Sequence, residues 1–293
     1  MRGVILIGAM AALCTACGSS AAVDEGTVQA PPPASGGSVV TPGGGGSSGG
    51  GTTVPTMQLQ AWLVRDGLIW PVQVTLPKSQ AVGGAAIQAM LAGPNPAQQR
   101  AGLSTTVPHG TRLLGLKVQG GTATIDLSSE FEAPGDAGSV TSRLAQVVYT
   151  LTQFPTVKRV AFLIDGQPVT AFPGSGTPLS RPQTRQDYVD AVPAIAVVTP
   201  SDHSVVSSPI TVSGVADVFE ANVSIEVLDA SGHLVGKTVT TATCGTGCVG
   251  TFTAQVPYDV STRQRGTVVV HDDDAAGTGT YPHEVRIPVT LMP

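Results

Sequence analysis

Residues 120–166 constrain the fold of this chain more than any other stretch, because three periodic patterns follow one another there. Residues 122–127 alternate apolar and polar side chains, which is the period of a half-buried strand. Residues 139–154 carry an apolar stripe at helical spacing, and Pro155 stops this helix because a proline disfavours the helical conformation of the residue before it. Residues 157–164 are almost continuously apolar, which favours a strand covered on both faces. The stretch therefore predicts a strand–helix–strand unit whose buried positions include no nucleophile.

The residues before this unit complete one domain. Their apolar patterns indicate strands at residues 57–64, 68–76 and 113–118 and a helix at residues 80–92. Pro71 lies inside the second strand, so we expect that strand at a sheet edge. Ser79 is placed to cap the helix. The predicted order β-β-α-β-β-α-β gives an α+β domain, with one mixed sheet and two helices on one face.

After residue 192 the helical periodicity ends and short β-rich runs recur. The runs occupy residues 195–199, 210–215, 223–228, 234–240, 250–256, 267–271 and 285–291. Short strands separated by turns in this way predict an all-β immunoglobulin-like sandwich. We therefore expect the two domains to span residues 57–192 and 193–293.

The first residues have the pattern of an export signal. Arg2 precedes an apolar run at residues 4–13, which is too short to span a bilayer. Two small residues then precede Cys17 and a glycine, a pattern that resembles a bacterial lipobox, in which the cysteine is lipidated and the signal is cleaved before it. Cys14 stands where such motifs usually have leucine, and an ordinary secretory signal is the alternative. The resemblance implies that residues 1–17 are a lipoprotein signal and that the protein is anchored in the cell membrane on its extracytoplasmic side.

Residues 18–56 are rich in glycine, serine and proline, and they cannot bury enough apolar surface to offset the cost of ordering. We expect a disordered tether that reaches on the order of 35 Å. The whole chain has 15 basic and 20 acidic residues, and its aromatic content is 4%. No basic stripe with interleaved aromatics occurs, so nucleic acid is not an expected partner.

Cys244 and Cys248 are separated by Gly-Thr-Gly, which allows a small loop closed by a disulfide. Such a bond suits an oxidising, extracytoplasmic compartment. A zinc site is the alternative, and it would need two more ligands, for which His271 and His283 are candidates.

The sequence contains two clusters of acidic residues, and neither predicts a cofactor. The adjacent residues Asp272, Asp273 and Asp274 suit a solvated loop, with calcium binding as the alternative. The other group, Asp126, Ser128 and Glu130, ends a strand, where such side chains form turn hydrogen bonds. An acid/base pair is the alternative there, but no histidine lies close by in the sequence.

An ordered set of short motifs in the first domain resembles the GerMN domain of sporulation and spore-germination proteins. The motifs are Ala89–Pro94, Leu103–Thr111, Ile125–Phe131, Val148–Phe154 and Ile164–Gly166. Thr184–Tyr188 resembles the stretch that commonly follows that domain. The resemblance implies a module similar in shape to ring-building modules of envelope complexes, without established catalytic residues.

The second domain resembles the immunoglobulin-like domain of bacterial spore germination, a frequent C-terminal companion of GerMN. The residues that carry this resemblance are Pro209–Ala216, Phe219–Val223 and Gly250–Phe252. The pairing implies a non-enzymatic, lipid-anchored envelope protein that binds or scaffolds envelope partners or other copies of itself. A peptidoglycan hydrolase or hydrolase accessory factor is the alternative. Trp70, on the expected edge strand, is the candidate partner surface, unless it packs under a helix.

Overall fold

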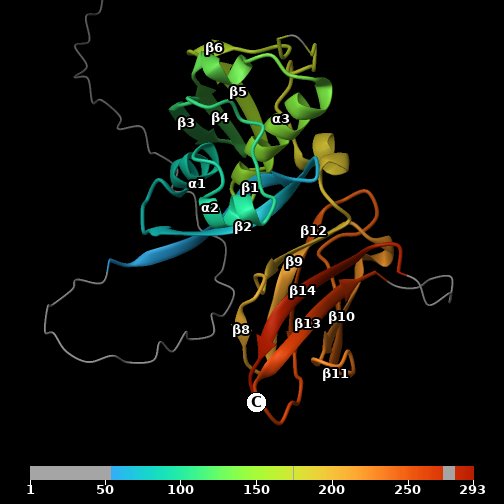
Figure 1. Ribbon diagram of the computed structural model, residues 1–293. Helices are drawn as coiled ribbons and strands as arrows, with labels where there is room; N and C mark the ends of the chain where they lie inside the picture. Colours follow the sequence, from blue (N-terminus) through green and yellow to red (C-terminus); the bar gives the residue numbers. More distant parts are fainter. Residues whose placement is uncertain (1–53, 174, 273–280) are drawn as a thin grey trace, which may run out of the picture.

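The computed structural model describes residues 54–173, 175–272 and 281–293. Figure 1 shows the two domains, one above the other, with strands β1 and β2 on the side of the first domain that faces the second. Cys17 and the expected signal lie outside the described residues, as do Asp273 and Asp274. No helix in the described ranges is both long and apolar enough to cross a membrane.

The predicted strand–helix–strand unit forms the centre of the first domain. It consists of β4 (Thr122–Leu127), α3 (Ala137–Leu151) and β5 (Arg159–Ile164), and the two strands pair in parallel. Helix α3 begins after Asp136, whose carboxylate accepts a hydrogen bond from the backbone nitrogen of Ser139 at 2.9 Å.

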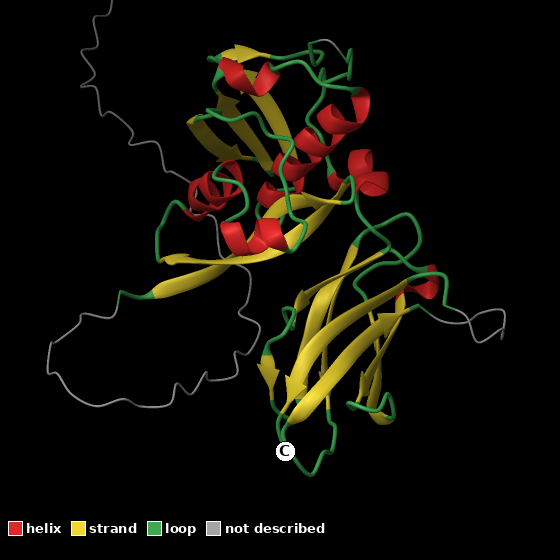
Figure 2. Ribbon diagram, in the orientation of Figure 1, coloured by secondary structure: helices red, strands yellow, loops and turns green. Residues whose placement is uncertain are grey.

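The sheet around this unit has the order β3-β4-β5-β6, with β3 (Leu113–Gln119) and β6 (Gln167–Pro168) antiparallel to their neighbours. Figure 2 shows the helices gathered beside this sheet, and the β4 side chains of one face, including Ile125, are fully buried. The prediction that residues 157–164 are covered on both faces is wrong. On the opposite face of β5, Arg159 is exposed and Ala161 and Leu163 are only partly buried. Both long helices cover the same face of the sheet.

Strands β1 (Thr56–Arg65) and β2 (Leu68–Pro77) pair with each other in a separate two-stranded sheet. The sequence predicted a single sheet, and the difference arises because α3 occupies the other edge of β1. The side chain of Gln153 accepts a hydrogen bond from the backbone nitrogen of Gln60 at 2.9 Å and donates one to its oxygen at 2.7 Å. Side chains of α3 and of the turn after it, such as Thr150 and Gln153, thus satisfy backbone groups of β1 that a neighbouring strand would otherwise pair.

The first long helix, α1 (Val82–Leu91), begins later than predicted. Ser79 is not its cap: the Ser79 hydroxyl accepts a hydrogen bond from the backbone nitrogen of Ala81, the residue before the helix, at 3.1 Å. The short helix α2 (Pro96–Arg100) was not predicted. A capping box stabilises its start. The Asn95 side chain accepts hydrogen bonds from the backbone nitrogens of Ala97 and Gln98, and the Gln98 side chain accepts one from the backbone nitrogen of Asn95.

The second domain is a sandwich of two sheets, and all its predicted strands are confirmed. One sheet has the order β12-β9-β7, made of β12 (Gly250–Val256), β9 (Ile210–Ala216) and β7 (Ile195–Thr199). The other has the order β11-β10-β13-β14-β8, made of β11 (Leu234–Thr241), β10 (Asn222–Leu228), β13 (Gln264–His271), β14 (Glu284–Leu291) and the short β8 (Val205–Val206). Valines such as Val212, Val223 and Val268 are completely buried between the sheets.

Candidate functional site

The acidic group at the end of β4 is engaged in the fold. Asp126 accepts a hydrogen bond from the backbone nitrogen of Gly166 at 3.0 Å, and Ser128 accepts one from that of Arg112 at 2.9 Å. A hydrogen bond from Ser128 also lowers the pKa of the exposed Glu130 below its usual value. These contacts tie the turn after β4 to its neighbouring loops, as the turn interpretation predicted.

The histidines near the second acidic group are also engaged. His271 is 2% exposed, its Nδ1 lies 2.7 Å from the backbone oxygen of Asp272, and its ring stacks on Tyr281 with centroids 3.6 Å apart. The Asp272 carboxylate lies 2.8 Å from Nδ1 of His283. Asp272 therefore joins the end of β13 to the start of β14.

The structure bears differently on the two metal sites that the sequence left open, zinc at Cys244 and Cys248 and calcium at residues 272–274. A disulfide joins Cys244 to Cys248, so neither sulfur is a free thiolate and the zinc alternative is wrong. The part of the chain that the structure describes contains no group of three or more histidine, cysteine, aspartate or glutamate side chains arranged to hold a metal. Asp273 and Asp274 lie outside that part, so calcium binding beside Asp272 stays a prediction.

Trp70 lies on β2, and within the described residues β2 pairs only with β1, so the strand is at an edge as predicted. The Trp70 side chain is half-buried and packs against the core of the first domain. The guanidinium carbon of Arg65 lies 5.0 Å from the centre of its ring, a distance at which a cation is attracted to an aromatic face. Trp70 is therefore partly a core residue and only partly a surface.

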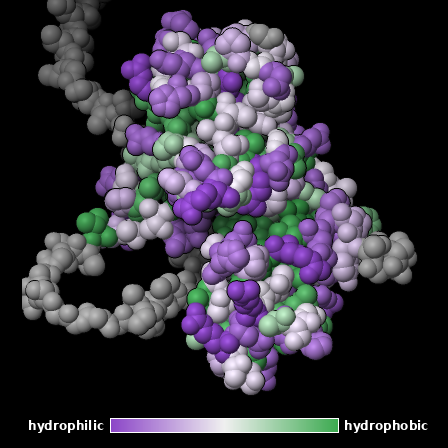
Figure 3. Space-filling model, in the orientation of Figure 1, coloured by the Kyte–Doolittle hydropathy of each residue, from purple (hydrophilic) through white to green (hydrophobic). Residues whose placement is uncertain are grey.

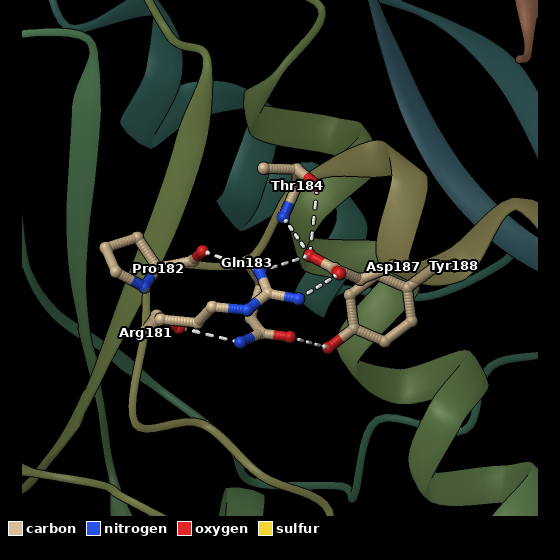
Figure 4. Close-up of polar contacts among 6 residues, drawn as sticks. All are labelled: Arg181, Pro182, Gln183, Thr184, Asp187 and Tyr188. Atoms are coloured by element: carbon tan, nitrogen blue, oxygen red, sulfur yellow. Dashed lines mark hydrogen bonds and ion pairs between the residues drawn. The ribbon is translucent and has the colours of Figure 1, made fainter.

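A polar network surrounds residues 181–188, in the segment that connects the two domains in sequence (Figure 4). Arg181 forms two hydrogen bonds with the carboxylate of Asp187, which also accepts from the backbone nitrogen of Thr184 at 2.7 Å and from its hydroxyl at 3.0 Å. The hydrogen bond from Arg181 is the main cause of a lowered pKa for Asp187. The network fixes the first turn of the 3₁₀ helix η2 (Arg185–Ala191).

A second set of hydrogen bonds, formed by Gln183, connects this network to the first domain. The backbone of Gln183 exchanges two hydrogen bonds with that of Val160 in β5, and the Gln183 side-chain oxygen accepts from the hydroxyl of Tyr188 at 3.0 Å. Both side chains are buried, and burial raises the pKa of Tyr188. Residues 183–188, which follow the sheet in sequence, are thus an ordered part of the first domain.

Arg185 lies against two aromatic rings of the first domain. Its guanidinium carbon is 4.7 Å from the ring centre of Tyr149 and 5.9 Å from that of Trp62, and its Nε donates to the hydroxyl of Thr152 at 2.8 Å. The hydroxyl of Tyr149 donates to the backbone oxygen of Arg185 at 3.2 Å, and burial raises the pKa of Tyr149 to about 12. These contacts fix η2 on helix α3.

The second domain contacts both η2 and the apolar cluster of the first domain. Gln186 of η2 donates its side-chain amide to the backbone oxygen of Gly247 at 2.9 Å. The apolar cluster of the first domain also includes three side chains of the sandwich, Ala196, Val215 and Val249. On the face drawn in Figure 3, hydrophilic groups cover most of both domains, and some of the hydrophobic surface shows where they meet. A continuous apolar core therefore runs through the junction.

Two features of this junction were missed at the level of sequence. Trp62 is completely buried, with its ring centre 4.7 Å from that of Tyr149, whereas the sequence pattern points to Trp70 alone. The sequence does contain a pattern that indicates burial of Trp62. Residues 61–64 are apolar without alternation, which is typical of a strand covered on both faces. The sequence shows Thr184–Tyr188 only as a resemblance, whereas in the structure Arg185 contacts the first domain and Gln186 contacts the second.

Comparison with known proteins agrees with this two-domain architecture. Residues 62–170 match the family model described as sporulation and spore germination, and residues 194–278 match the immunoglobulin-like domain of bacterial spore germination. The chain is similar to the first GerMN domain of the sporulation protein GerM from Bacillus subtilis, with 26% identity and a TM-score of 0.40 over 45% of this chain and 99% of that one. It is also similar to the tandem GerMN domains of GerM, with 17% identity and a TM-score of 0.40 over 80% of this chain and 60% of that one. No curated protein sequence matches this chain.

Proposed function

We propose that this chain, which carries a sporulation and spore-germination domain followed by the immunoglobulin-like domain of bacterial spore germination, is a non-enzymatic scaffold of the cell envelope. A lipid on Cys17 would hold it at the membrane, and the tether would carry the two domains away from the lipid surface. The first domain would bind an envelope protein or peptidoglycan component, or a second copy of the chain.

The observation that carries the proposal is the order of these two domains in one chain. The geometry of the polar groups supports it. Asp126, Ser128 and Glu130, the candidates for acid/base work, have hydrogen-bond partners that stabilise a turn. The large network around Arg181 and Asp187 likewise joins parts of the same chain.

Strand β2 is the candidate contact of this scaffold. Gln73 and Thr75 are exposed on β2, and Trp70, which alternates onto the other face of the same strand, is half-buried with its ring nitrogen covered. An edge strand offers unpaired backbone groups to a partner, and a nearby aromatic side chain adds apolar contact area. Trp70 remains the side chain to test first.

Site-specific photo-crosslinking in native membranes tests this proposal. A photoreactive residue at Gln73 or Thr75 is expected to yield a discrete adduct, identified by mass spectrometry as an envelope component or as the chain itself. The same residue at Lys117 or Gln119, which are exposed on β3, is the matched control. Trp70→Glu is expected to abolish the β2 adduct while the far-UV spectrum stays native.

Each other outcome has a definite meaning. Adducts from β3 alone would move the contact to the other sheet of the domain. Turnover of purified peptidoglycan by the full chain would replace the scaffold with the hydrolase alternative. Unfolding of the Trp70→Glu variant would assign Trp70 to the core, and the crosslinks from Gln73 and Thr75 would then decide the proposal by themselves.

A further inference from the structure

The Cys244–Cys248 disulfide lies at the point where the second domain touches the junction. It closes the connection between β11 and β12. Both cysteines are partly exposed, in a surface loop that a small reductant can approach. Neither is among the buried side chains of the apolar core of the sandwich.

The loop is packed tightly onto its own domain. The backbone nitrogen of Thr246 donates to the oxygen of Val218 at 3.1 Å. A Cβ atom on Gly245 would lie 2.5 Å from the backbone nitrogen of Ala221 and 2.8 Å from the Val218 oxygen, so only glycine fits there. The disulfide and these contacts together hold the loop against residues 218–221, which precede β10.

Gly247 connects this loop to the first domain. Its backbone nitrogen donates to the carboxylate of Asp217 at 2.7 Å, and its oxygen accepts from the side chain of Gln186 at 2.9 Å. Gly247 has a φ of +80°, a conformation that glycine adopts without strain. Two residues later, Val249 enters the apolar cluster of the first domain. The position of the loop therefore determines two contacts across the junction, one polar and one apolar.

We infer that the Cys244–Cys248 disulfide is a redox-sensitive latch on the domain junction. When closed, it holds Gly247 and Val249 in place to contact the first domain. When open, the loop gains freedom, these contacts weaken, and the two domains move relative to each other while both remain folded. The inference depends only on the junction and stands whether or not the proposed envelope role is correct.

The chemistry of opening is ordinary thiol–disulfide exchange with a dithiol reductant. A thiolate of the reductant attacks one cysteine sulfur, the S–S bond breaks, and a mixed disulfide forms. The second thiol of the reductant then attacks that mixed disulfide, which releases Cys244 and Cys248 as two thiols and leaves the reductant as a cyclic disulfide. Two electrons pass from the reductant to the protein, and two protons complete the thiols.

Hydrogen exchange of the full chain, followed by mass spectrometry, tests the latch. Peptides that cover residues 185–196 are expected to exchange faster by about tenfold after reduction, since local opening becomes easier. The double variant Cys244→Ser/Cys248→Ser is expected to behave in the same way without reductant. Peptides from β4, β10 and β13 should keep their protection in both cases.

Gln186→Ala isolates the polar contact of the latch. It should speed exchange at residues 185–196 with the disulfide intact, whereas Gln119→Ala, at an exposed glutamine of β3, should not. Unchanged exchange at residues 185–196 in the reduced protein and in both variants would overturn the inference. Loss of protection throughout β10 and β13 would also overturn it, because the disulfide would then stabilise the whole sandwich.

Discussion

Gln146 of helix α3 donates its side-chain amide to the backbone oxygen of Trp62 in β1 at 2.8 Å. The other end of the same amide accepts from the backbone nitrogen of Thr106 at 3.1 Å and from its hydroxyl at 2.9 Å. Gln146 is completely buried. One helical side chain therefore satisfies both a strand edge and the loop that covers it.

Gln146→Ala should lower the free energy of unfolding, because it removes the partners of the buried backbone oxygen of Trp62 and the partly buried backbone nitrogen of Thr106. Each buried group left unpaired costs about 1–3 kcal/mol. Urea unfolding of the full chain measures the loss, and Gln119→Ala, at an exposed position, is the matched control. An equal effect of the two substitutions would contradict the role given to Gln146.

Gly84→Ala should stabilise the first domain. Gly84 lies inside α1, and a Cβ there would lie 3.8 Å from the nearest side-chain atom, an ordinary contact distance. Alanine in place of a helical glycine gains about 0.5–1 kcal/mol. Gly83→Ala should gain less, because its Cβ would lie 3.1 Å from Leu116. Thermal unfolding of both variants checks the order, and a larger gain at Gly83 would contradict it.

The junction should weaken in acid. The folded-state pKa of Asp187 is lowered, mainly by its hydrogen bond with Arg181. A lowered carboxyl pKa contributes stability that is full above the unfolded value, about 3.9, and is lost as the pH falls through the folded value. Asp187→Asn should flatten this part of the pH profile of stability, measured by urea unfolding between neutral pH and pH ~3. Asp190→Asn, at an exposed position of the same helix, is the matched control.

Cys17→Ser should change where the protein is found. Without the thiol no lipid can be attached, so the variant is expected in the soluble fraction or with its signal uncleaved. Cell fractionation and mass spectrometry of the N-terminal peptide measure both outcomes, with Cys14→Ser as the matched control. Normal membrane retention and normal processing of Cys17→Ser would overturn the lipidation proposal.

Much of the fold could be predicted because its strands and helices follow local patterns. Residues 122–127 alternate, and β4 has one buried face as expected. The runs between residues 195 and 291 became strands with boundaries shifted by three residues or fewer. The GerMN resemblance and the disulfide at Cys244 rested on short contiguous motifs, which a sequence displays directly.

The junction could not be predicted, because its contacts join residues that are distant in the chain. Arg185 meets Tyr149 and Trp62, and no periodicity relates these positions. The edge of β1 is another example, since Gln153 looks like an ordinary polar residue at the end of a helix. Only the tertiary arrangement shows that its amide pairs with a strand.

The apolar side chains shared across the junction also limit how this protein can evolve. Ala196 and Val215 contribute to the cluster of the first domain although they belong to strands of the second. A recombination event that fused a foreign sandwich after Val192 would put side chains selected for another neighbour in the places of Ala196 and Val215. We therefore expect these two domains to be inherited as a pair, with compensating changes on the two sides of the boundary.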